Sequence, residues 1–489
     1  MPLEVLRPPR PGPGGRSPSQ GPGQEEGVKT KEKRISGHRS NYPALVGVYL
    51  MANALPDSIV VVDGPDCALY KAHYIHGRHD LNSTLLDING FHRICFTNVC
   101  AQSVTKDHNE LILRKLHMID KLDSARVVLL TSLPGCFITG LDYEHLMRSA
   151  SHFMRQEVFA LPPAALVGDW IDGYGIAMRG VARHMKLRQG KGKRDQVAIV
   201  GYLMDRNEGD HRGNQIELKR MLAALGLDLV SVWLDGQPYD SLKRVEEAGV
   251  IISLPYGRGA AEELAKKTGA RLVEADLPFG LGYCADFLRR IAAATGREER
   301  AEAFILAEEA EAFRRLEWLT PYLFLHKKAA FLGDPFLLNG FLDVCEDLGI
   351  TPAECFVMGR ENRFGFKPRK GAPPVVFEPD IYHEAVNRFI GKPPDLIVTN
   401  TNDMVREIKS PTKAILELGF PSYTHHNLGN TPFLGYQGFL CFADRIAEHL
   451  FYQRRVMTKQ EGRWAEGDWD KLAAGPAGEY TVPHEALKQ

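Results

Sequence analysis

The sequence predicts an α/β fold in which three parallel sheets follow one another along the chain. Its 489 residues are too many for one compact core, because single domains rarely exceed roughly 250–300 residues. A hydrophobic share of 44% is that of a globular protein. Strand patterns alternate with helical patterns in three successive series, which is typical of parallel sheets with helices on both faces. We therefore predict three Rossmann-like parallel-sheet domains.

The first series follows a basic segment rich in proline and glycine. Residues 1–40 contain almost no large apolar side chain, which predicts a disordered tail. Residues 41–190 form the first predicted domain. Its strand candidates are the apolar runs Ser58–Val62, Arg93–Phe96 and Val127–Leu130, and its clearest helical pattern is Asn109–Lys121.

Two further series complete the predicted fold. The basic segment Arg188–Arg194 is interpreted as a linker to the second domain, residues 195–325. The predicted elements of that domain are Val197–Val200, Gln215–Leu225, Leu229–Trp233, Val250–Leu254, Arg271–Val273 and Ala301–Leu319. Those of the third domain, residues 326–460, are Lys328–Leu332, Leu337–Leu348, Glu354–Met358, Asp395–Val398 and helices to about Tyr452. Residues 461–489 are predicted to be an irregular C-terminal tail.

The charge balance argues against several kinds of partner. Sixty basic and sixty-one acidic residues nearly cancel, so we expect no general affinity for nucleic acid or for a membrane surface. No run reaches the roughly 18 apolar residues that a membrane helix needs. The N-terminus also lacks the apolar region of a secretory signal. We therefore expect a cytoplasmic location.

Four of the eight cysteines fall within the first predicted domain. Grouped cysteines in a large cytoplasmic chain indicate metal binding or catalysis more than disulfides. Cys67 follows the first strand and the tight turn at Gly64, and Gly64 is our candidate for contact with the bound cofactor. Cys95 and Cys100 bracket the end of the second strand, and Cys136 follows the third. Because parallel strands share one carboxyl edge, the loops converge, and four thiolates are the usual ligands of a [4Fe–4S] cluster. The alternative is that these cysteines are small buried hydrophobic residues.

Several other polar residues are candidates for binding. Arg258 opens a helical pattern after Gly257, which predicts an anion- or cofactor-binding helix N-terminus. The loop Asp205–Asn214 either contacts a substrate or partner or is a solvated turn; its candidate residues are Arg206, Asp210, His211 and Arg212. Three histidines recur every third residue and are interpreted as surface or interface residues: His73, His76 and His79.

Several segments, in the right order, resemble the nitrogenase component 1 family. Asn41–Tyr74 (NYPALVGVYLMANALPDSIVVVDGPDCALYKAHY) resembles the opening of these subunits, where a strand leads into a Gly-Pro-x-Cys-type turn whose cysteine ligates an iron–sulfur cluster. Cys67 is its match. Leu130–Tyr143 (LTSLPGCFITGLDY) resembles the later ligand loop of the family. Further similar segments are Phe279–Ile291, Lys328–Pro335 and Leu418–Ile446.

The chain departs from the family pattern at two ligand positions. Asn41 and Tyr42 occupy the region of a cysteine common near the start of the first domain, and Leu133 stands where the family has a cysteine before proline. These departures favour a rearranged cluster, held by Cys67, Cys95, Cys100 and Cys136.

The resemblance also points to a possible active site. In the catalytic nitrogenase subunit, one histidine and one cysteine hold the active-site metal cluster. The histidine position falls on His425, which makes His425 the candidate catalytic residue. The cysteine position falls near Pro255, so reduction of dinitrogen on the same cofactor is not expected.

The resemblance implies an iron–sulfur oxidoreductase subunit. It would receive electrons from a separate ATP-dependent reductase, reduce a small-molecule substrate, and pair with an identical or paralogous subunit in a dimer or tetramer. One alternative is a scaffold on which a metal cofactor is assembled and handed on, which the missing cysteine near Pro255 would suit. A second alternative is a metal-free β/α enzyme that binds a nucleotide or a sugar.

Overall fold

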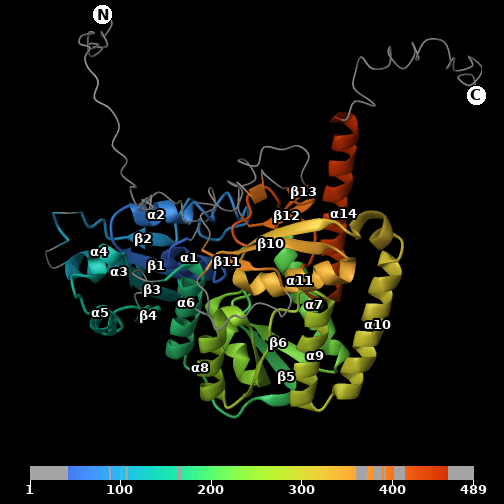
Figure 1. Ribbon diagram of the computed structural model, residues 1–489. Coiled ribbons are helices and arrows are strands. Elements are labelled where there is room, and N and C mark those ends of the chain that lie inside the picture. Colours follow the sequence, from blue (N-terminus) through green and yellow to red (C-terminus); the bar gives the residue numbers. More distant parts are fainter. Residues whose placement is uncertain are drawn as a thin grey trace, which may run out of the picture. The chain divides into compact units, whose positions relative to one another are not determined.

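The computed structural model describes residues 42–86, 90–100, 102–104, 108–162, 168–359, 372–378, 388–389, 393–400 and 414–460, with side chains to residue 453. Within them, three parallel sheets follow one another along the chain, as predicted (Figure 1). The two predicted tails lie outside the described residues. Apart from residues 193–194, the strands of these sheets fall within the three predicted domains, whose boundaries stay predictions. None of the described helices combines the length and the apolar character needed to cross a membrane.

The first sheet has the strand order β2-β1-β3-β4. Its strands are β1 (Ser58–Asp63), β2 (Ile94–Phe96), β3 (Val127–Ser132) and β4 (Glu157–Ala160). Helices α3 (Asn109–Ile119) and α5 (Tyr143–Ala150) cover one face. Helices α1 (Ala44–Asn53) and α6 (Trp170–His184) cover the other. Every residue of β1 and β3 is therefore buried, which explains their uninterrupted apolar character.

Helices α1 and α6 pack at backbone distance through two glycines. A Cβ atom at Gly47 would lie 1.8 Å from the carbonyl oxygen of Trp170, and one at Gly173 would lie 1.8 Å from that of Ala44. No side chain fits at either position, so this approach requires glycine. The contact fixes α1, which leads into β1, against the helix that connects the first sheet to the second.

The second sheet has the order β6-β5-β7-β8. Its strands are β5 (Lys193–Val200), β6 (Asp228–Val232), β7 (Ala248–Ser253) and β8 (Arg271–Glu274). Its helices are α7 (Gly209–Ala224), α8 (Arg258–Thr268), α9 (Leu281–Thr295) and α10 (Glu298–Leu316). Strand β5 begins at Lys193, inside the segment predicted to be a linker. Its first residues are exposed and polar, which makes their sequence resemble that of a loop.

The third sheet has the order β11-β10-β9-β12-β13. Its strands are β9 (Lys328–Gly333), β10 (Thr351–Val357), β11 (Val375–Phe377), β12 (Leu396–Thr399) and β13 (Ala414–Glu417). Its helices include α11 (Pro335–Leu348) and the long α14 (Gly435–Gln460), which stands at the right of Figure 1. The carboxyl ends of parallel strands are where loops form binding sites, so these edges hold the candidate sites.

Candidate functional site

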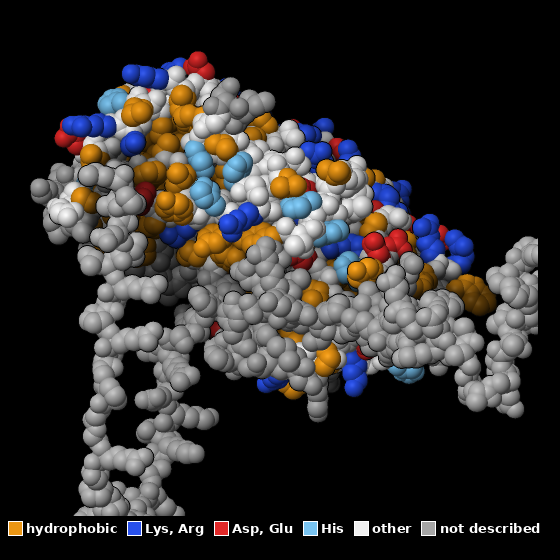
Figure 2. Space-filling view, turned by 90° about the horizontal axis from the view of Figure 1, so that it is seen from above, with side chains coloured by type: hydrophobic (Ala, Val, Ile, Leu, Met, Phe, Trp, Pro, Cys, Tyr) orange, Lys and Arg blue, Asp and Glu red, His pale blue; other side chains and the backbone are white. Residues whose placement is uncertain are grey.

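An apolar cavity of about 480 Å³ opens at the carboxyl edge of the first sheet. Three of the four predicted cysteines line it: Cys67 at the start of α2 (Cys67–Ala72), Cys100 after β2, and Cys136 in α4 (Pro134–Phe137). Its apolar walls include Leu45, Val99, Val104 and Leu133. Figure 2, which looks down on the molecule from the α2 side of Figure 1, shows hydrophobic side chains gathered on this face.

Cys95 does not reach this cavity. It lies inside β2, paired with Val61, rather than at the end of the strand. Its side chain packs on the face covered by α3 and α5, and burial there raises the pKa of its thiol. The predicted placement of Cys95 beside the other three cysteines is therefore corrected, because alternate residues of a strand point to opposite faces of the sheet.

The thiols of Cys100 and Cys136 differ in how readily they ionise. Cys100 is exposed, and the hydroxyl of Ser103, 3.4 Å from its Sγ, lowers the pKa of the thiol. Cys136 is buried, and burial together with the nearby Asp63 carboxylate raises its pKa to about 11. Cys100 is therefore the easier of the two to convert to a thiolate.

Alkylation of the metal-free chain at pH 8 is expected to modify Cys100 at least about tenfold faster than Cys136. The larger thiolate fraction of Cys100 outweighs its lower intrinsic nucleophilicity. Raising the pH from 8 toward 11 should speed the reaction of Cys136 by a larger factor than that of Cys100, because the pKa of Cys136 is raised and that of Cys100 is lowered. Peptide mapping by mass spectrometry measures both rates, and Ser103→Ala, which removes the hydroxyl, should slow Cys100 alone. Equal rates at pH 8 would contradict the assignment.

A compact set of polar side chains lies directly behind Cys136. Asp63, the last residue of β1, is fully buried and accepts hydrogen bonds from the hydroxyls of Thr97 at 2.8 Å and Tyr143 at 2.7 Å. Nε2 of His108 lies 2.7 Å from Asp63 Oδ2. No motif marks these residues in the sequence. The one available signal is an aspartate that closes an otherwise apolar strand.

Gly64 shapes the turn between β1 and Cys67 without lining the cavity. Its backbone N–H donates to Thr97 Oγ1 at 2.9 Å. A Cβ atom at this position would lie 2.6 Å from Cδ1 of Leu133, so glycine lets this wall of the cavity approach β1. A direct role for Gly64 in cofactor binding stays a prediction.

Arg258 is directed at oxygen atoms of its own sheet. Its guanidinium donates to the carbonyl oxygens of Ser253 at 2.8 Å and Ala275 at 3.1 Å, and to the carboxylate of Asp276 at 3.3 Å. These contacts tie the start of α8 to the ends of β7 and β8. The predicted anion-binding role of Arg258 stays a prediction.

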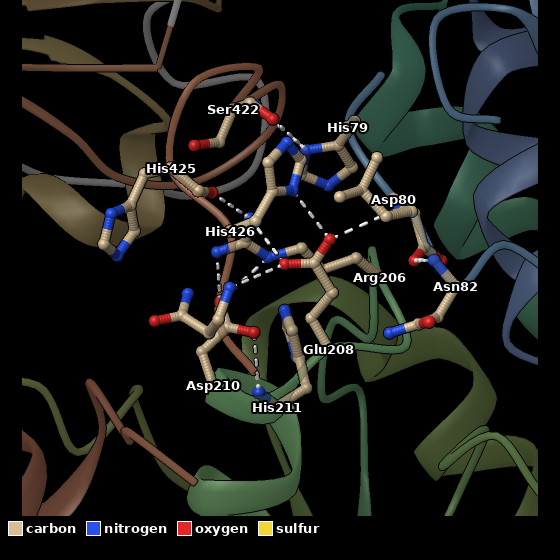
Figure 3. Close-up of polar contacts among 12 residues, drawn as sticks. His79, Asp80, Asn82, Arg206, Glu208, Asp210, His211, Ser422, His425 and His426 are labelled. Carbon is tan, nitrogen blue, oxygen red and sulfur yellow. Dashed lines mark hydrogen bonds and ion pairs between the residues drawn. The ribbon is translucent and has the colours of Figure 1, made fainter. Parts of the chain in front are cut away.

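A second polar site forms where loops from all three sheets meet (Figure 3). Asp205, which follows β5, lies 2.5 Å from Nε2 of His211 and 3.4 Å from Nε2 of His79. Ser422, in the loop after β13, donates its backbone N–H to Nδ1 of His79 at 2.9 Å. Asp205, His79 and His211 are all buried. The surface position expected for His79 is therefore wrong, and its alternative, an interface role, stays a prediction. The loop Asp205–Asn214 is not a solvated turn.

Arg206 and Glu208 extend this junction toward the third sheet. The Nε of Arg206 donates to Asp210 at 2.9 Å, and its Nη1 donates to the carbonyl oxygen of His425 at 2.8 Å. Glu208 accepts the backbone N–H of Asn427 at 2.9 Å and lies 2.8 Å from Nδ1 of His426. Of the predicted loop residues, only Arg212 is exposed.

The imidazole of His425 points away from the other labelled side chains in Figure 3. Its Nε2 is buried and has no hydrogen-bond partner among the residues that the structure describes. Burial, followed by Arg445 and Arg206, lowers its pKa to about 4, so the ring is neutral at pH 7. The catalytic role predicted for His425 stays a prediction.

Pro255 begins a short 3₁₀ turn, and the hydroxyl of the adjacent Tyr256 donates to Asp334 at 2.6 Å.

Asp205→Asn is expected to lower the free energy of unfolding by about 2 kcal/mol, because it removes the charge that two buried imidazoles face. Burial alone would raise the pKa of Asp205. The imidazoles of His211 and His79 nevertheless hold that pKa well below its usual range. Because the carboxyl pKa is lower in the folded chain than in the unfolded chain, ionised Asp205 stabilises the fold at pH values above its unfolded pKa, which is near 4. This stabilisation is lost as the pH falls through the pKa of the folded chain. The deficit of the variant should thus persist above about pH 4 and shrink in stronger acid. Denaturant unfolding measures it.

The matched control for this prediction is Asp195→Asn, at an exposed position on β5. It changes the same charge outside the junction and should leave the free energy of unfolding within about 0.5 kcal/mol of the wild type. Equal effects of the two substitutions would contradict a stabilising role for the junction.

The fold places the chain in a known structural class. It superposes on a chain of nitrogenase Cp1, solved at pH 6.5, with a TM-score of 0.71 and 19% sequence identity, over 90% of this chain and 97% of that one. The predicted class, three Rossmann-like sheets arranged as in nitrogenase component 1, is confirmed. The family model of the nitrogenase component 1 type oxidoreductases matches residues 43–451. The chain belongs to this family, as the resemblance implied.

Curated relatives are distant. The nitrogenase molybdenum-iron protein beta chain of Bradyrhizobium sp. (strain ANU 289) is 24% identical over 343 residues, which is 62% of this chain and 64% of that protein. The nitrogenase iron-iron protein alpha chain of Rhodobacter capsulatus is 24% identical over 270 residues, 53% of this chain and 48% of that protein. The chain thus matches less than two thirds of the length of these relatives.

Proposed function

We propose that the chain is an iron–sulfur oxidoreductase subunit whose cluster is bound in the cavity lined by Cys67, Cys100 and Cys136. The observation that carries this proposal is the convergence of three thiols, from three separate segments, on one apolar cavity. The names of the relatives, molybdenum-iron and iron-iron proteins, support a metal-dependent function. Our candidate is a [4Fe–4S] cluster, which cysteine thiolates commonly hold.

The donor set fits an iron–sulfur cluster in kind, and it supplies three of the usual four thiolates. Cys95 lies on the other side of the sheet, so it does not complete the set. The cavity is open, and large apolar side chains on its neighbouring helices are exposed: Tyr70 of α2 at 65%, and Ile138 beside α4 at 73%. An identical or paralogous subunit that covers this surface would supply the fourth ligand and exclude solvent.

The residues of the chain would perform two tasks around such a cluster. Leu45, Val99 and Leu133 would keep water from the thiolates, and this low-polarity wall would set the reduction potential together with hydrogen bonds to sulfur. The cluster itself would supply one-electron chemistry. Electrons would come from an ATP-dependent reductase and pass to a small-molecule substrate, with His425 as our candidate for contact with that substrate. The cytoplasm is the compartment we expect.

Anaerobic purification and reconstitution with iron and sulfide test this proposal directly. We expect a brown protein that binds iron and sulfide in equal amounts, with an electron-spin signal that appears on reduction. Reduction by an ATP-dependent iron–sulfur reductase should be faster with ATP than without it. A colourless protein without iron after reconstitution would rule out the cluster and favour a metal-free enzyme.

A cofactor-assembly scaffold is the second candidate. It is favoured by the sequence near Pro255, which lacks the cysteine that ligates the active-site cluster in the family, so a metal cofactor would be held there only transiently. A scaffold transfers metal to an acceptor protein and shows no turnover with its reductase. Substrate turnover by the reconstituted complex would exclude it.

A further inference from the structure

We propose a second metal site, in which Asp63, His108 and Cys136 bind one divalent ion of the Zn²⁺ type when the chain carries no iron–sulfur cluster. One ligand-type atom of each residue lies within 4.8 Å of the other two. The residues come from three separate segments, the end of β1, the start of α3, and α4. Their exposed fractions are 0%, 3% and 2%, so the three groups face one another out of solvent.

The donor chemistry selects the class of metal. One sulfur, one imidazole nitrogen and one carboxylate oxygen form a set that Zn²⁺ and Co²⁺ accept, whereas Ca²⁺ and Mg²⁺ prefer oxygen ligands alone. Around a tetrahedral Zn²⁺ with bonds near 2.0 Å, nitrogen and oxygen ligands lie about 3.3 Å apart. The His108–Asp63 contact of 2.7 Å would thus open by about half an ångström. The thiol of Cys136 would close toward the ion and release its proton to solvent.

The surroundings of Asp63 resemble those of a supported metal ligand. Thr97 and Tyr143 donate hydrogen bonds to its two carboxylate oxygens and fix their orientation, as outer partners of metal ligands do. Among the described residues, no lysine or arginine forms an ion pair with this fully buried carboxylate. A buried carboxylate requires a positive partner, which either protonated His108 at 2.7 Å or a divalent ion bound by both residues would supply.

The site borders the cavity of the proposed cluster on the side of Cys136. Cys136 also lines the cavity that holds Cys67 and Cys100, so the fourth coordination position would face that cavity and take a water molecule. Three protein ligands and one open position are the pattern of a catalytic or exchangeable zinc site rather than a structural one. Because both sites need the Cys136 thiolate, the divalent ion and the cluster would exclude each other. This ion site does not require Cys67 or Cys100.

Titration of the full-length, cluster-free chain with Co²⁺ under anaerobic conditions tests the proposal. We expect one equivalent of Co²⁺ to produce a thiolate-to-metal charge-transfer band and the visible bands of a tetrahedral ion, both abolished by added Zn²⁺. Cys136→Ser should remove the charge-transfer band, and His108→Ala should prevent binding. Tyr143→Phe keeps every ligand and removes one outer hydrogen bond, so it should weaken the affinity about tenfold without loss of the fold.

Cys67→Ser and Cys100→Ser are the matched controls and should bind Co²⁺ like the wild type. Loss of the Co²⁺ spectrum in these controls would place the ion in the cluster cavity and overturn the proposal, as would an unchanged spectrum in Cys136→Ser. Iron reconstitution is measured separately in the same variants. Co²⁺ binding without iron uptake would refute the cluster alone, and iron uptake without Co²⁺ binding would refute this site alone.

Discussion

Cys67→Ser is expected to reduce iron incorporation to background. Cys67 is exposed and lines the cavity at the start of α2. Serine keeps the size of the side chain and removes the soft sulfur ligand that iron–sulfur clusters require. Iron and sulfide analysis after anaerobic reconstitution, with the electron-spin spectrum of the reduced protein, measures the loss.

Cys95→Ser provides the matched control because it removes a thiol from the same sheet but outside the cavity. It should retain the iron content of the wild type, since Cys95 packs against α3 and α5. If Cys95→Ser lost iron and Cys67→Ser kept it, the cluster would not be bound in this cavity.

Gly173→Ala should destabilise the fold by about 4 kcal/mol, at the upper end of single substitutions. The added methyl group would lie 1.8 Å from the carbonyl oxygen of Ala44, an atom of the α1 backbone that no side-chain rotation can move. The two helices must therefore separate and expose part of the core beneath them. Thermal unfolding followed by circular dichroism measures the drop in midpoint.

Gly175→Ala tests whether this effect arises from the helix contact. Gly175 lies on the same helix, and a Cβ atom there would meet only the carbonyl oxygen of Tyr256, at 3.2 Å. The gain in helix propensity is the same in both variants. Similar midpoints for the two variants would show that the approach of α1 and α6 contributes little to stability.

The sequence predicts the central strands well and the outer ones poorly. Ser58–Val62, Val127–Leu130 and Val197–Val200 are buried on both faces, so each is an uninterrupted apolar run that stands out from its surroundings. Strands β4, β11 and β13 have only three or four residues and lie at the outer edges of their sheets. A run of that length is too short to show a reliable period. These three strands are missed, whereas β2 and β8, which are as short, are predicted.

The candidate site is predicted only as far as the sheet geometry follows from sequence. Cys67 and Cys136 come directly after strands, and the rule that parallel strands share a carboxyl edge places them together. The prediction fails for Cys95 because a shift of one residue along a strand moves a side chain to the other face of the sheet. Asp63, His108 and Tyr143 are distant in sequence and belong to no motif, so only the folded chain reveals their contacts.

The junction of Figure 3 has a consequence for how this gene can be divided or recombined. Loops from the three sheets supply His79, Asp205 and Ser422. The imidazole of His79 lies 3.4 Å from the carboxylate of Asp205 and accepts the backbone N–H of Ser422. A cut between the first and second sheets would separate the imidazole of His79 from Asp205 and from the backbone of Ser422. Exchange of one domain of this chain with that of a relative would therefore succeed only if the three loops are exchanged together.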